Sequence, residues 1–152
     1  MKQPFFAITL GVALLTGCAQ TAYVPRSQTM DVRSARAIVE HALTTSNLQV
    51  GGNWTPSAKV HAARVRGDGF GVAVQDASID WSLFNNVKYG APGLRTCPFA
   101  SVNPALTDFG PLGSPRYGVE MPGCEMRIFF HRHDDAKNFV DALYTLKVNA
   151  GR

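Results

Sequence analysis

The chain has 152 residues, of which 45% are hydrophobic and 17% are charged, and its formal net charge is +4. This length allows one domain and excludes two of ordinary size, and the hydrophobic content excludes a disordered chain. The positive residues are scattered without a run or a stripe, so we expect no nucleic-acid partner.

The first feature along the chain is an apolar run at residues 4–15, which follows the positively charged Lys2. Such a run is too short to span a bilayer and is typical of a secretory signal peptide. It ends in Leu15-Thr16-Gly17-Cys18, which resembles the lipobox of bacterial lipoproteins. The resemblance implies cleavage before Cys18, a diacylglycerol on its thiol and a fatty acid such as palmitate on its new amino group. Residues 1–17 are therefore expected to be a signal peptide.

The same resemblance implies where the protein is located. Two or three acyl chains give stable membrane anchoring, which a single chain does not. In Gram-negative bacteria, Asp after the modified cysteine tends to retain a lipoprotein in the inner membrane. Ala19 stands there instead, which for a Gram-negative source implies the outer membrane, on its periplasmic face. Residues 18–30 are small and polar without an apolar period, and they are predicted to be a flexible tether for a single domain at residues 31–152.

The domain is expected to begin with an amphipathic helix from Asp31. Asp31 or Ser34 can cap its start, and Asn47 with the following Gly51-Gly52 marks its end. Its apolar positions recur at intervals of three and four residues: Ala35, Ile38, Val39, Ala42 and Leu43.

The central part of the chain has a period of two, which indicates strands. Gly67-Asp68-Gly69 predicts a hairpin turn between strands at residues 59–66 and 70–75. Tight turns favour antiparallel pairing, so we expect one antiparallel sheet of about five or six strands. The apolar faces are Phe70, Val72 and Val74; Ile79, Trp81 and Leu83; Tyr117, Val119 and Met121; and Cys124, Met126, Ile128 and Phe130.

A second amphipathic helix is expected near the C-terminus, with Asp134 as its N-cap. Its sequence DDAKNFVDALYTLK and the strand before it resemble pleckstrin-homology-like bacterial domains. In that family a helix with the pattern Ala-x-x-Phe-x-x-Ala-Leu plugs one end of a bent antiparallel barrel. The resemblance covers at most Lys59 to Lys147. The overall expectation is an α+β domain with two helices, either such a barrel or an open sheet with both helices on one face.

Two cysteines remain beyond Cys18, and export places them in an oxidising compartment, so Cys97 and Cys124 are expected to form a disulfide. The Gly- and Pro-rich segment between them needs such a crosslink. The longer stretch from Leu94 to Gly123, which includes this segment, is expected to be a long loop. With its aromatic residues and an exposed sheet edge, it is a candidate partner surface, for which we name Trp54, Phe99 and Phe109.

Catalytic signatures are absent from the sequence: it contains no G-x-S-x-G, H-E-x-x-H or C-x-x-C motif. His131 and His133 would share the outer face of the last strand if that strand continued, and such a pair can bind a metal ion when a third ligand is near. We expect no enzyme and no cofactor. The leading hypothesis is a lipid-anchored binding or assembly module with an envelope protein as partner. The alternative is a small periplasmic enzyme or metal-binding protein that uses His131 and His133.

Overall fold

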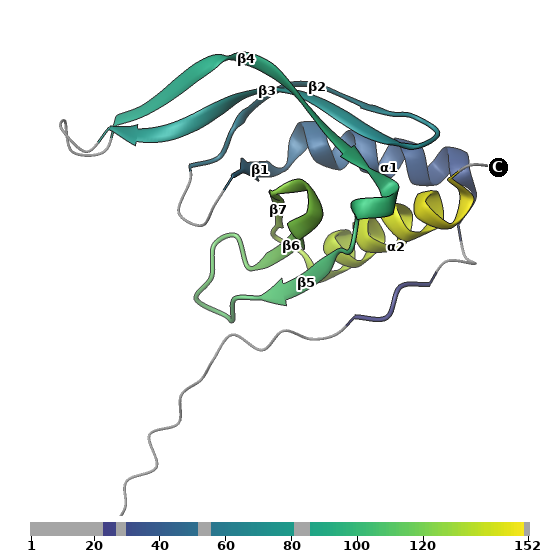
Figure 1. Ribbon diagram of the computed structural model, residues 1–152. Helices are drawn as coiled ribbons and strands as arrows, with labels where there is room; N and C mark the ends of the chain where they lie inside the picture. Colours follow the sequence, from purple (N-terminus) through teal and green to yellow (C-terminus); the bar gives the residue numbers. More distant parts are fainter. Residues whose placement is uncertain (1–22, 27–29, 52–55, 81–85, 151–152) are drawn as a thin grey trace, which may run out of the picture.

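The computed structural model describes residues 23–26, 30–51, 56–80 and 86–150 (Figure 1). Cys18, Trp54, Trp81 and Leu83 lie outside the described residues, so the signal peptide and the lipobox remain expectations. The described elements, in chain order, are α1 (Val32–Thr45), β1 (Asn47–Val50), β2 (Lys59–Val65), β3 (Gly69–Asp80), β4 (Asn86–Pro98), η2 (Phe99–Ser101), β5 (Ala105–Asp108), β6 (Tyr117–Met121), η3 (Pro122–Cys124), β7 (Met126–Phe130) and α2 (His133–Asn149).

The strands form two antiparallel sheets, one with the order β1-β7-β6-β5 and one with the order β2-β3-β4. The α+β class and the antiparallel pairing are confirmed, as is the hairpin from β2 to β3. The expectation of one sheet with five or six strands is wrong, because the described residues contain seven strands in two sheets. β4 and β5 also show that the stretch from Leu94 to Gly123 is not one long loop.

α1 forms because its apolar residues make a stripe that the rest of the domain buries. Asp31 caps the helix by accepting a hydrogen bond from the Ser34 backbone N–H at 2.9 Å. Glu40 then fixes α1 to the three-stranded sheet, since its Oε1 accepts the Val65 backbone N–H at 2.8 Å. The buried residues of α1 are Ala35, Val39, Ala42 and Leu43.

α2 begins at His133, two residues earlier than the predicted cap implies. Its N-cap is Arg132, without a side-chain hydrogen bond, so the prediction of Asp134 as N-cap is wrong. Asp134 and Asp135 lie in the first turn instead, where negative charge is favourable beside the positive end of the helix dipole. The buried face of α2 contains Phe139, Val140, Leu143 and Leu146.

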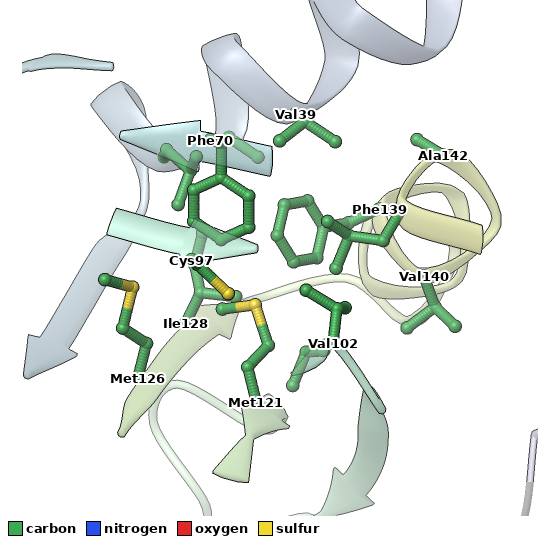
Figure 2. Packing of buried hydrophobic residues seen from close by; sticks show 14 of the residues in the cluster. Val39, Phe70, Cys97, Val102, Met121, Met126, Ile128, Phe139, Val140 and Ala142 are labelled. Carbon is green, nitrogen blue, oxygen red and sulfur yellow. The ribbon is translucent and has the colours of Figure 1, made fainter. Parts of the chain in front are cut away.

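Both sheets and both helices share one hydrophobic core (Figure 2). The Phe139 ring of α2 packs against Phe130 of β7 with centroids 5.4 Å apart, and Phe70 of β3 packs against Phe99 at 6.4 Å. Cys97 at the end of β4 is bonded to Cys124 of η3, and their Cα atoms are 5.3 Å apart, so the expected disulfide is confirmed. The crosslink therefore joins the two sheets at the edge of the common core.

Residues 23–26 lie against α2, well before the expected start of the domain. The Tyr23 hydroxyl donates to the Asp141 carboxylate, with Oη 2.9 Å from each oxygen, and the Arg26 N–H donates to Oδ1 at 2.8 Å. This part of the predicted flexible tether is therefore in contact with the domain. We call residues 23–26 the strap.

Candidate partner-binding groove

The outer face of the four-stranded sheet carries the side chains that point away from the core. Alternate residues of a strand face opposite sides, so burial of Leu48 and Ile128 leaves their neighbours outside. The register aligns Asn47, Phe129 and Gly118 in one row across β1, β7 and β6. The next row consists of Gln49, Arg127 and Glu120.

Phe109, just after β5, covers the first of these rows. Its ring packs against Phe129 with centroids 5.9 Å apart, and it lies directly over Gly118. A Cβ atom at Gly118 would come within 2.8 Å of Phe109 Cε2, closer than real contacts allow. Glycine at position 118 therefore permits the close approach of the Phe109 ring to the sheet.

The loop between β5 and β6 forms one wall of the groove. Arg116 holds the base of this loop, because its Nε and Nη2 each donate to the Asp108 carboxylate at 2.9 Å. The Gly110 N–H adds a hydrogen bond to Oδ1 at 2.8 Å, and Gly110 adopts φ +80°, which suits glycine. These bonds, the one from Arg116 above all, lower the pKa of Asp108. At the tip of the loop the Leu112 side chain is 98% exposed.

Together these parts enclose an open groove of about 530 Å³. A smaller hollow of about 220 Å³ continues it toward η3, and the two share Gln49 and Arg127. Arg127 forms an ion pair with Glu120, and its guanidinium lies 6.0 Å from the Phe129 ring centroid. The lining residues of the larger part are Asn47, Gln49, Ser57, Phe109, Gly113, Ser114, Pro115, Arg127 and Phe129.

Of the aromatic residues expected at a partner surface, Phe109 lies at the groove. Phe99 is 1% exposed and belongs to the core, so its assignment to a partner surface is wrong. Its position in a Gly- and Pro-rich stretch suggested exposure, but η2 turns the ring inward onto Phe70. Trp54 lies outside the described residues. Phe129 was missed as a site residue, although the alternation in the strand MRIFF already places it opposite the buried positions.

The two histidines do not share a strand face. β7 ends at Phe130, His131 follows it in a bend, and His133 is the first residue of α2. The His133 ring packs against Tyr117 with centroids 5.1 Å apart. Within the part of the chain that the structure describes, no three His, Cys, Asp or Glu side chains are grouped so that they could hold a metal ion. The two histidines were expected on one face because the strand was assumed to continue, but the chain bends toward the helix directly after Phe130.

A second exposed surface is the far half of the β3–β4 hairpin, which extends from the body as a ribbon (Figure 1). β2 pairs with β3 only as far as Gln75, so beyond that residue β3 and β4 pair only with each other among the described strands. Tyr89 and Val87 are 51% and 44% exposed, and they pair with the buried Ala77 and the half-buried Ile79.

No family model, curated protein or solved structure matches this chain. Across the described residues, neither helix combines the length and the apolar character that crossing a membrane requires. The residues of the groove and the lipobox sequence are therefore the features that bear on function.

Proposed function

We propose that this protein is a bacterial lipoprotein, anchored through Cys18, whose single domain binds a protein partner in the cell envelope without catalysing a reaction. In a Gram-negative source, Ala19 favours the periplasmic face of the outer membrane. The Cys97–Cys124 disulfide supports export, since disulfides persist in oxidising compartments.

The groove on the four-stranded sheet is the observation that carries the binding function. Its Phe109–Phe129 pair offers an apolar surface, and the exposed Leu112 directly precedes Gly113, which lines the groove. Asn47 and Gln49 offer amide groups that both donate and accept hydrogen bonds. An extended polypeptide segment presents apolar side chains and backbone amides in alternation, so it is the occupant that this lining suits.

Lipid attachment is tested first, by metabolic labelling with an alkyne fatty acid. The wild-type chain should take up the label, and Cys18→Ser should lose it and accumulate as an unprocessed precursor. Label that persists in Cys18→Ser would contradict the anchor.

Partner binding is tested with a photo-crosslinking amino acid placed at Leu112 in the full lipoprotein in cells. We expect a discrete crosslinked protein from this position and none from the exposed Asp134 on α2, which is the matched control. Gly118→Val should abolish the crosslink, because the new side chain displaces the Phe109 ring that lies over it. Equal crosslinking from Leu112 and Asp134, or an undiminished crosslink in Gly118→Val, would contradict the groove as the binding site.

The alternative function, an enzyme or metal protein using His131 and His133, has no observation in its favour among the described residues. His133 is engaged with Tyr117, and His131 belongs to the bend before α2.

A further inference from the structure

Asp141 is an unusual residue for the buried face of α2. Only 8% of its surface is exposed, and charged side chains are rarely buried without partners. The strap supplies partners: the Tyr23 hydroxyl bridges both carboxylate oxygens, and the Arg26 N–H binds Oδ1. The position of the strap is thus specified by hydrogen bonds to a charged group, which are stronger than those between neutral groups.

Two further contacts hold the Tyr23 ring on α2. Lys137, one turn before Asp141, places its Nζ 5.7 Å from the ring centroid, and the ring also packs against the hydrophobic core. Val24 is 79% exposed, so the strap is a surface segment tied down at Tyr23 and Arg26. Burial, with the hydrogen bond to Asp141, raises the pKa of Tyr23, and the phenol therefore keeps its donor proton at neutral pH.

The geometry points to the α2 surface around Asp141 as the membrane-facing side of the domain, held there by the strap. This inference rests on the proposed lipid anchor at Cys18. With the strap docked, only residues 19–22 separate the lipid from Tyr23, and the fully extended reach is about 17 Å. If the whole segment to Asp31 were free, the reach would be about 40 Å. The contact with Asp141 thus more than halves the greatest distance that the tether allows between the lipid and the domain.

Docking of the strap also orients the domain. Figure 1 shows the strap on the side of the molecule formed by α2, and the far half of the β3–β4 hairpin extends away from that side. The domain therefore keeps α2 toward the bilayer and directs the hairpin outward.

The experiment uses the complete lipoprotein in vesicles of phosphatidylethanolamine and phosphatidylglycerol. Trypsin cuts after Arg26 only when this segment is free to enter the protease, and the cut is followed by mass spectrometry of the fragment that ends at Arg26. Tyr23→Phe, which removes only the hydroxyl, and Asp141→Leu should each raise the cleavage rate at least tenfold. Asp134→Asn removes an exposed carboxylate from the same helix and should leave the rate unchanged.

A second readout measures the position of the domain. A fluorescent amino acid at the exposed Asn138 of α2 should transfer energy to a lipid dye more efficiently in wild type than in Tyr23→Phe or Asp141→Leu. Unchanged cleavage and unchanged energy transfer in both variants would overturn the inference. The Tyr23→Phe variant tests the inference by itself if Asp141→Leu misfolds. Loss of acyl label at Cys18 would overturn the proposed function itself, whereas an acylated protein with an undocked strap would overturn only the inference.

Discussion

The disulfide between Cys97 and Cys124 should be one of the larger single contributions to the stability of this domain. The two residues are 27 positions apart, and closing a loop of that size lowers the entropy of the unfolded chain by an amount worth about 3.5 kcal/mol. The loop contains β5 and β6, two of the four strands of one sheet. Cys97→Ala/Cys124→Ala should therefore reduce the free energy of unfolding by about 3.5 kcal/mol.

Urea denaturation of a chain that starts at Ala19, followed by circular dichroism, measures this loss. The uncrosslinked unfolded chain exposes more surface, so the slope of the free energy against urea should rise in the double variant. For that reason the comparison uses the extrapolated free energies in water rather than the midpoints. A loss below about 1 kcal/mol would refute the entropic reasoning, because the measured range for removing native disulfides is about 2–5 kcal/mol.

Two other substitutions test the core and the groove wall. Phe139→Ala should lower the free energy of unfolding by about 3–5 kcal/mol, because a large side chain with no exposed surface is removed from the core. The same denaturation assay measures this loss. A loss no larger than that of Phe129→Ala would contradict the core described above. The pKa of Asp108 is lowered in the folded state, so its contribution to stability is present above the usual carboxyl pKa and is lost as the pH falls through the lowered value. The gap in unfolding midpoint between wild type and Asp108→Asn should be constant near neutral pH and shrink in acid, and a gap that persists undiminished to pH 2 would contradict the ion pair with Arg116.

The elements with strong local patterns were predictable from the sequence. The amphipathic stripe of α1, the hairpin at Gly67-Asp68-Gly69 and the alternation in β6 and β7 all correspond to the structure. In α1, β6 and β7 the side chains of one face point into a single core, so the apolar period predicts the element, whereas the hairpin was predictable from its turn residues.

β1, β4 and β5 were not predicted as strands, and each has a physical reason. β4 lies at the edge of its sheet and is exposed at every residue except Cys97, so it lacks an apolar alternation, and it contains Pro92, which an edge strand tolerates. β1 and β5 have only four residues each, too few to establish a period. These strands exist because of their partners, which no local pattern reveals.

The groove was only partly predictable for the same reason. Phe109 was identified from its aromatic character in a Gly- and Pro-rich stretch, a signal that Phe99 shares although its ring is buried. What distinguishes the two is the pairing of β5 with β6, which places Phe109 over Gly118. The register between strands, and not composition, determines which aromatic ring reaches the surface.

The pairing of the first and last elements has a consequence for biosynthesis. α1 packs against α2, β1 pairs with β7, and the strap lies on Asp141. The N-terminal elements of the domain therefore find their packing partners in its C-terminal elements. α1 also contacts β2, but a chain that crosses a membrane from its N-terminus cannot complete the burial of α1 until the segment with Phe139 and Leu143 has followed. If the chain is exported as we propose, its folding should be completed only at the end of translocation, and until then part of the apolar stripe of α1 stays exposed to the chaperones of the compartment.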